Sequence, residues 1–294
     1  MATLEVVSAG VFATLQDLGR FGYSDMGLGR SGAADRGAAA LANRMVGNLP
    51  DAALIEVALG GLALRADGNV LVAITGASCA VTVSGPCAGQ RRGAAVLELI
   101  ALSDGQVLRL ETPTIGLRNY LAVRGGFSVP PILGSRSYDT LAQIGPPPLS
   151  NTTRLPVGSA AGDWPIVGAV APPLTDDGPT LLEVTVGPRA DWFTSDALIQ
   201  LVNQVYQVNP RSDRIGMRLD AGNPLERVDT RELPSEGVEE GSLQVAPDGF
   251  PVLFLADHPV TGGYPVIAVV RAADVDRAAQ ARPGDFVCFR IRTR

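Results

Sequence analysis

Residues 256–265, ADHPVTGGYP, combine the only histidine of the chain, His258, with other side chains that can transfer protons. General acid–base chemistry needs such groups beside the reacting atom, and backbone amides freed by glycine can receive an oxyanion. The candidate catalytic residues are therefore Asp257, Thr261 and Tyr264, and Gly262 and Gly263 are the candidate oxyanion-binding residues. Taken by itself, the stretch also fits an ordinary loop between two strands with a solvent-facing histidine.

Two neighbouring segments add candidate substrate-binding residues. PRSDRIGMRLD (210–220) carries arginines that can converge on an anion, although exposed ion pairs with nearby aspartates are an equally good interpretation. Segment 234–245 adds polar side chains just before the histidine-containing stretch. The candidates from these two segments are Arg214, Arg218, Ser235, Glu236 and Gln244.

A glycine-rich segment, residues 16–48, is the third candidate. Its glycines let the backbone approach a ligand, and Arg20 and Arg30 can hold a carboxylate or a phosphate. An irregular loop that wraps the end of a barrel explains the same pattern, and the pattern alone favours that interpretation.

The elements that must position these residues are mostly strands. DFVCFRIR (285–292) alternates apolar and polar residues with period two, which is typical of a half-buried strand. Similar runs, separated by Gly, Pro and Asp, predict barrels or sandwiches rather than βαβ units. The other predicted strands are 4–10, 53–61, 69–77, 79–85, 94–102, 106–112, 118–126, 181–188, 251–257 and 264–270.

Helices are predicted to be few. One follows Ser31 and ends at Gly47, with Asp35 in its first turn, and others are expected at about 191–206 and 272–281. The chain is therefore predicted to be mainly β, with a β-rich domain at 1–145, a Pro- and Gly-rich connection at 146–180, and a second β-rich domain at 181–294.

Composition narrows the classes of function. The 294 residues are 46% hydrophobic and 18% charged, which predicts a folded chain with a sizeable core. The net charge of −6 argues against nucleic acid or an anionic membrane as a partner. Without an apolar run of membrane-spanning length or a signal peptide, and with three cysteines outside any CxxC spacing, the chain is expected to be cytoplasmic.

All 24 basic residues are arginine, so the chain has no lysine. This excludes a Schiff-base lysine, a Walker-type lysine and a biotinyl-lysine on this chain. A single histidine excludes HExxH and multi-histidine zinc sites, and no metal site is expected. GxSxG and strand-linked GxGxxG motifs are also absent from the sequence.

Six blocks of sequence, in order, resemble the biotin-dependent carboxyltransferase family, whose members are also called allophanate hydrolase subunit two, KipI antagonist or the C subunit of 5-oxoprolinase. The resemblance extends from near residue 4 to residue 292. The blocks are QDLGRFGY, SGAADRGAAALANRMVGN, YLAVRGGFSVPPILGSRS, RSDRIGMRL, PSEGVEEGSLQVAPDGFPVLFLAD and TGGYPVIA. The resemblance implies a cyclophilin-like β-barrel architecture with two subdomains.

The resemblance also implies a function within a larger assembly. The chain is expected to be the carboxyltransferase-like subunit of an ATP-dependent 5-oxoprolinase, working with a KipI-like companion and a third subunit on a small amide and inactive alone. ATP would be used by the complex, at a site that a partner can carry. Alternatives are carboxyl transfer to urea or a similar amide, from biotin carried by another chain, and a non-enzymatic role that antagonises a partner protein.

The sequence departs from the family pattern at His258, where many relatives carry arginine. The loop is therefore expected to act through Asp257 and the Thr-Gly-Gly-Tyr backbone more than through its histidine. In this hypothesis Arg214 and Arg218 hold the substrate carboxylate or a phosphorylated intermediate. Asp257 and Tyr264 position the substrate and deprotonate it.

Overall fold

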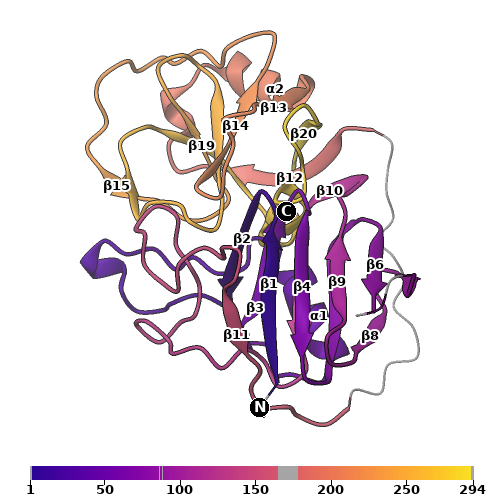
Figure 1. Ribbon diagram of the computed structural model, residues 1–294. Coiled ribbons are helices and arrows are strands. Elements are labelled where there is room, and N and C mark those ends of the chain that lie inside the picture. The colour runs from indigo at the N-terminus through magenta and orange to yellow at the C-terminus, as the bar shows by residue number, and fades with distance from the viewer. Residues whose placement is uncertain (1, 86, 88, 165–177, 293–294) are drawn as a thin grey trace. The chain divides into compact units, whose positions relative to one another are not determined.

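The computed structural model describes residues 2–85, 87, 89–164 and 178–292. The chain divides into two compact units (Figure 1). Unit 1 contains the described residues among 1–20, 35–138 and 143–173. Unit 2 contains 21–34, 139–142 and the described residues among 174–294. Each unit is mainly β with few helices, which confirms the predicted fold class.

The described part of unit 1 contains two antiparallel sheets. The first has six strands in the order β11 (Arg154–Pro156), β1 (Thr3–Ala9), β4 (Leu62–Asp67), β9 (Val107–Leu110), β6 (Val81–Ser84) and β7 (Arg91–Ala94). The second has five strands in the order β2 (Phe12–Gln16), β3 (Leu54–Ala58), β10 (Ile115–Val123), β5 (Val70–Ser78) and β8 (Leu99–Leu102).

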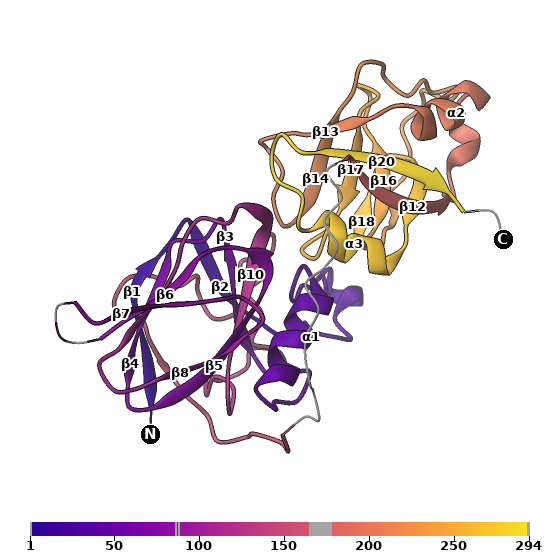
Figure 2. The ribbon, with the colours of Figure 1, turned by 90° about the vertical axis from the view of Figure 1, so that its right-hand side faces the viewer.

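Both sheets of unit 1 contribute to one hydrophobic core. Val6 and Leu64 come from the six-stranded sheet, and Val57 and Ile74 from the five-stranded sheet, and all four are buried in the same cluster. The sheets therefore pack face to face, as in a sandwich or barrel. Helix α1 (Arg36–Met45) packs on β5 and β10 of the second sheet (Figure 2).

Unit 2 is built around a closed barrel. Its described strands follow the order β12 (Thr180–Val186), β19 (Val266–Val270), β16 (Ser242–Val245), β17 (Pro251–Phe254), β14 (Gly216–Asp220), β13 (Tyr206–Val208) and β20 (Phe286–Ile291). The parallel pairing of β12 with β20 closes the barrel around buried residues such as Leu182, Leu243 and Phe289. Closure leaves no unpaired sheet edge among the described strands of the barrel.

Smaller elements complete unit 2. Strands β15 (Glu236–Gly237) and β18 (Thr261–Gly262) form a short antiparallel pair. The helices are α2 (Ser195–Asn203), α3 (Ala272–Ala278) and the 3₁₀ turns η1 (Ser24–Met26) and η2 (Ala190–Trp192).

The predicted helices are confirmed, with shorter bounds. Asp35 precedes α1 as its N-cap, and its carboxylate accepts a hydrogen bond from the Ala38 N–H at 2.8 Å. The helix expected at 191–206 begins only at Ser195 because Thr194 caps it. It ends before Tyr206, which is buried in the barrel as part of β13.

Several strands differ from the prediction. Strand β14 lies in the arginine-rich stretch 210–220 and was not predicted. Its Met217 and Leu219 face the core, while Arg218 is exposed. The run 53–61 is predicted as one strand, but the chain turns at Gly60 and Gly61 and returns as β4. Sequence patterns locate apolar runs well, whereas mixed runs depend on the neighbouring strand for their pairing.

The units differ from the predicted domains at 1–145, 146–180 and 181–294. Segments 21–34 and 139–142 lie within the predicted first domain but belong to unit 2. Part of the predicted connection forms the edge strand β11, which pairs with β1, and residues 165–177 lie outside the described residues. Sequence patterns do not reveal such excursions, because long-range contacts alone create them.

Within the described ranges, none of the helices combines the length and the apolar character that a bilayer crossing demands.

Glycine is required at position 76, where β5 meets β10 beside an irregularity in their register. Gly76 has φ +86°, and a Cβ built there would lie 2.3 Å from the Arg118 carbonyl oxygen. Gly134 has φ +78° but has no atom within 4 Å of such a Cβ. We expect Gly134→Ala to cost about 1 kcal/mol, for the left-handed backbone alone, and Gly76→Ala to cost clearly more. Equal losses in thermal or urea unfolding would contradict the close approach.

Candidate functional site

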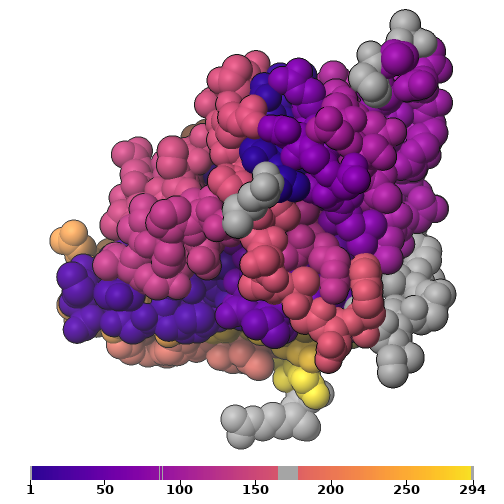
Figure 3. All heavy atoms as spheres, turned by 60° about the horizontal axis from the view of Figure 1, so that its bottom comes forward, coloured from indigo at the N-terminus to yellow at the C-terminus, as the bar shows by residue number. Residues whose placement is uncertain are grey.

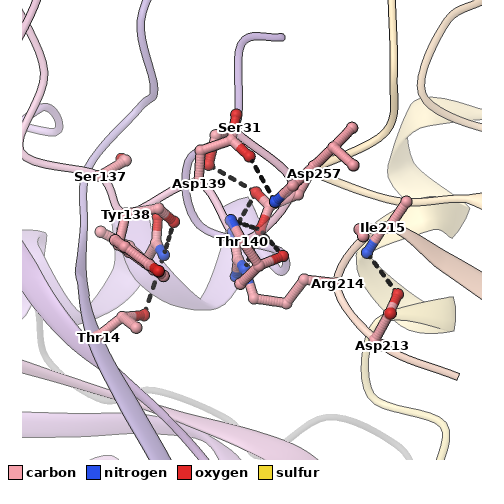
Figure 4. A network of polar contacts seen from close by, with 12 residues as sticks. Thr14, Ser31, Ser137, Tyr138, Asp139, Thr140, Asp213, Arg214, Ile215 and Asp257 are labelled. Carbon is pink, nitrogen blue, oxygen red and sulfur yellow. Dashed lines mark hydrogen bonds and ion pairs between the residues drawn. The ribbon is translucent and has the colours of Figure 1, made fainter. Parts of the chain in front are cut away.

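Asp257 is the centre of a buried polar cluster in unit 2 (Figure 4). It follows strand β17, is fully buried, and accepts five hydrogen bonds from described residues. Oδ1 accepts from the Ser31 hydroxyl at 2.6 Å and from Arg214 Nη2 at 3.0 Å. Oδ2 accepts from Arg214 Nε at 2.8 Å and from the Thr140 hydroxyl and N–H at 2.7 and 3.0 Å. A carboxylate offers about four lone-pair positions, so these donors saturate it.

Arg214 forms a two-pronged ion pair with this carboxylate and is itself 4% exposed. Its Nη2 also donates to the Gly32 carbonyl oxygen at 2.6 Å. The loop before β14 holds the arginine in place, because Asp213 Oδ1 accepts from the N–H groups of Ile215 and Gly216 at 2.8 and 3.0 Å. The Asp257 N–H donates to the Arg214 carbonyl oxygen at 3.0 Å, which joins the two loops a second time.

The glycine-rich segment supplies Ser31 to the cluster. Ser31 has φ +56° and Gly32 has φ +100°, so the chain turns through the left-handed region at both positions. Such a backbone is unfavourable for serine, and the hydrogen bond to Asp257 compensates for it. Two residues earlier, a Cβ at Gly29 would lie 3.0 Å from the His258 carbonyl oxygen, so the segment packs directly on the histidine-containing loop.

A four-residue turn, 139–142, supplies Thr140. Asp139 is 2% exposed, and its Oδ1 accepts from the N–H groups of Leu141 and Ala142 at 2.9 Å each. This Asx-type turn fixes the backbone so that both the N–H and the hydroxyl of Thr140 face Asp257. Three separate chain segments therefore meet at one carboxylate.

Opposing effects act on the pKa of Asp257. Burial raises it most strongly among the single effects, but the charge of Arg214 and the hydrogen bonds from Arg214, Ser31 and Thr140 together outweigh burial. The pKa of Asp257 therefore lies below its ordinary value. A saturated, buried carboxylate with a lowered pKa is a poor proton acceptor, so the geometry favours a positioning role over the predicted deprotonating one.

The loop that contains Thr261 and Tyr264 is more open. Thr261 is exposed, and Tyr264 is 46% exposed. The buried Gln244 amide donates to the Tyr264 carbonyl oxygen at 2.7 Å, and a Cβ at Gly262 would lie 2.5 Å from Gln244 Nε2. Gln244 thus supports this loop, and a larger residue at position 262 would displace the Gln244 amide.

The remaining predicted binding residues lie in different surroundings. Glu236 faces Gly262 across the β15–β18 pair and forms an ion pair with Arg189, whose Nε lies 3.0 and 2.9 Å from its two carboxylate oxygens. Ser235 is exposed beside it. Arg218 is exposed on β14, whereas Arg214 is buried, so these two arginines do not converge on one anion.

Arg20 belongs to unit 1 and is 2% exposed. Its Nη2 donates to the carbonyl oxygens of Ser137 and Ile144 at 2.5 and 3.3 Å. Arg20 thus holds two turns of unit 1 together, which differs from the predicted anion binding.

Sequence reasoning missed Ser31, Asp139 and Thr140. The sequence offers only weak signals for them: a serine between an arginine and a glycine, and a Tyr-Asp-Thr triplet that can form an Asx turn. Among the described residues, no group of three or more His, Cys, Asp and Glu side chains can hold a metal ion. The candidate site consists of the Asp257–Arg214 cluster and the loop 258–264 that follows it.

Comparisons with known proteins give a consistent result. A family model described as carboxyltransferase domain, subdomain A and B, matches residues 26–291. The C subunit of 5-oxoprolinase from Escherichia coli (strain K12) is 33% identical over 291 residues, which is 97% of this chain and 90% of that protein.

Two solved structures are also similar over nearly the whole chain. The crystal structure of TTHA0988 has a TM-score of 0.85 and 32% identity and matches 99% of this chain. The crystal structure of K. lactis urea amidolyase has a TM-score of 0.89 and 28% identity and matches 98% of this chain. The chain spans 55% of the first structure and 18% of the second, so both are longer proteins that contain a similar part.

Asp257→Asn tests whether the buried ion pair supports the cluster. The asparagine NH2 group would face the hydrogen-bond donors that now surround the carboxylate, and the Arg214 charge would lose its counter-ion. Breaking a buried pair in this way lowers the free energy of unfolding by about 3–5 kcal/mol. Glu183→Gln is the matched control, because Glu183 pairs with Arg271 and Arg290 at the surface, where solvent screens ion pairs and they contribute little to stability. Similar losses in urea unfolding for the two variants would show that Asp257 does not hold the cluster together.

The pH dependence of stability provides a second test. Because the folded-state pKa of Asp257 is lowered, its contribution is fully present above the unfolded-state pKa of about 3.9. That contribution is lost as pH falls through the lower folded-state pKa. We expect the stability difference between the wild type and Asp257→Asn to shrink as pH falls below about 4, whereas the Glu183→Gln difference, small throughout, changes little. A difference for Asp257→Asn that stays constant or grows on acidification would contradict the lowered pKa.

Proposed function

Because this chain belongs to the family of the carboxyltransferase domain, subdomains A and B, we propose that it is a subunit of a multi-chain, ATP-dependent amidohydrolase. Its most specific assignment is the carboxyltransferase-like subunit of a 5-oxoprolinase, which opens 5-oxoproline to glutamate. The observation that carries this proposal is the match over 97% of this chain and 90% of the C subunit of E. coli 5-oxoprolinase.

In this proposal the chain works with a KipI-like companion and a third subunit and is inactive alone. ATP is assigned to a partner, because the glycine-rich segment does not fit a phosphate. The N–H groups of Gly27 and Leu28 already donate to the carbonyl oxygens of Ser24 and Tyr23. The carboxylate of Asp35 occupies the N-terminus of α1, where a phosphate would otherwise bind. In Figure 3 the indigo segment around residues 21–27 lies at the surface.

The proposed roles follow from the accessibility of each group. Arg214 and Asp257 satisfy each other, so they position the surrounding loops and leave substrate contact to other residues. Thr261 and Tyr264, the exposed side chains of the loop, contact the small amide. The backbone amide of Gly263 bears the developing oxyanion, while the pairing of Gly262 with Glu236 and the hydrogen bond from Gln244 hold the loop in place.

A second candidate function is carboxyl transfer from biotin to urea or a similar amide. The similarity to K. lactis urea amidolyase over 98% of this chain favours it. Since the chain has no lysine, the biotin would have to be carried by another chain. The two candidates therefore differ in their need for a biotinylated partner.

The experiment that separates them is ATP hydrolysis by this chain copurified with its natural partners. Turnover stimulated by 5-oxoproline, lost when this chain is omitted and insensitive to avidin, is the expected result. Stimulation by urea with inhibition by avidin would replace the proposal by the carboxyltransferase. Stimulation by neither amide would reject both and leave a non-enzymatic role.

Two adjacent glycines provide a matched pair for testing the loop. Gly262→Ala forces the Gln244 amide away from the Tyr264 carbonyl, and a displaced catalytic loop can cost roughly ten- to hundredfold in turnover. Gly263→Ala meets no atom closer than the Leu233 carbonyl oxygen at 3.7 Å, which is an ordinary contact. We expect amide-stimulated ATP hydrolysis of the complex to fall strongly only for Gly262→Ala. Equal activity of the two variants would remove this loop from the proposed site.

A further inference from the structure

His258 is a buried titratable residue to which the proposed roles assign no task. It directly follows Asp257 in the sequence and is only 8% exposed. The imidazole stacks on Phe254, with ring centroids 6.1 Å apart and the planes 20° from parallel. Its Nδ1 lies 2.7 Å from the carbonyl oxygen of Pro259.

The Pro259 carbonyl determines which ring nitrogen carries the proton. A carbonyl oxygen can only accept a hydrogen bond, so Nδ1 at this distance must be the donor. In the neutral ring the lone pair then lies on Nε2. In the described part of the chain, no residue forms a hydrogen bond with Nε2.

The backbone around the ring is also fixed. The His258 N–H donates to the Leu255 carbonyl oxygen at 3.1 Å, and a Cβ built on Gly29 would lie 3.0 Å from the His258 carbonyl oxygen. The neighbouring Asp257 is held by the five hydrogen bonds of the buried cluster. An acceptor held in this way loses little conformational freedom when a ligand binds.

We infer that Nε2 of His258 accepts a hydrogen bond from a ligand N–H and thereby selects an amide. The choice of an amide rests on the proposed function. A neutral imidazole in this tautomer favours ligands that bring an N–H donor, and it disfavours carboxylate or phosphate oxygens, which bring only acceptors. His258 is then a binding residue that contributes specificity, while the exposed part of the loop contacts the rest of the amide.

The tautomer can be measured directly because the chain has one histidine. The protein, labelled with ¹⁵N-histidine, gives one pair of ring nitrogen signals, which report which of the two nitrogens carries the proton. We expect a protonated Nδ1 and an unprotonated Nε2. The opposite tautomer would overturn the inference, whatever the enzyme does.

Ligand recognition is tested on the labelled chain within its complex, with 5-oxoproline and urea as probes and acetate as the acceptor-only control. We expect an amide that the complex turns over to shift the Nε2 signal, while acetate leaves it in place. An amide that is turned over without moving this signal would overturn the inference and leave the proposed function intact. If the complex turns over neither amide, the proposed function and the inference about His258 are both rejected.

Two substitutions separate the acceptor from the bulk of the ring. His258→Asn can keep the donor to the Pro259 carbonyl but has no acceptor at the Nε2 position, whereas the longer side chain in His258→Gln can place an amide oxygen there. Loss of one hydrogen bond corresponds to a roughly tenfold increase in KM for the amide. We expect that loss for His258→Asn and a smaller one for His258→Gln, with KM for ATP unchanged in both. An unchanged amide KM in His258→Asn would contradict the role of Nε2.

Discussion

The buried ion pair between Asp257 and Arg214 is the interaction on which unit 2 depends. A carboxylate without solvent must be neutralised and hydrogen-bonded, because the cost of burying a bare charge exceeds the net stability of most domains. Here the compensation comes from Arg214, Ser31 and Thr140, and the last two arrive from parts of the chain that lie far away in sequence. Hydrogen bonds to one carboxylate therefore tie segments 21–34 and 139–142 to the rest of unit 2.

The residues of the candidate site therefore fall into two groups, those that pair with each other and those that a ligand can reach. Groups that satisfy one another, such as Asp257 with Arg214, are rigid and unavailable to a ligand. Groups just beyond them, such as Tyr264 and the imidazole of His258, have exposed surface or an unoccupied nitrogen. A rigid inner cluster that supports the neighbouring loop preorganises a binding site. Gln244 extends this rigidity to the loop itself through the Tyr264 carbonyl.

The predicted site residues have different surroundings in the structure. Asp257 is buried in a polar cluster, and Gln244 and Glu236 lie beside the loop that follows it. Arg20, however, belongs to unit 1, and Arg218 points outward from a strand that was not predicted. The sequence does not distinguish an arginine that binds a ligand anion from one that is paired within the protein, because the pairing residue can come from any part of the chain. Ser31 and Thr140 were missed for the same reason.

The sequence by itself determined the mainly β fold, the three helices, the exclusion of lysine chemistry and the family, because each depends on local periodicity, composition or ordered motifs. Only the tertiary structure decided that the unit boundaries are discontinuous, that Asp257 is a saturated carboxylate and that the Pro259 carbonyl sets the tautomer of His258. These features depend on which groups meet across the fold and on whether water reaches them. Burial and partnership control both pKa and hydrogen-bonding capacity, and neither is encoded by a residue's immediate neighbours in sequence.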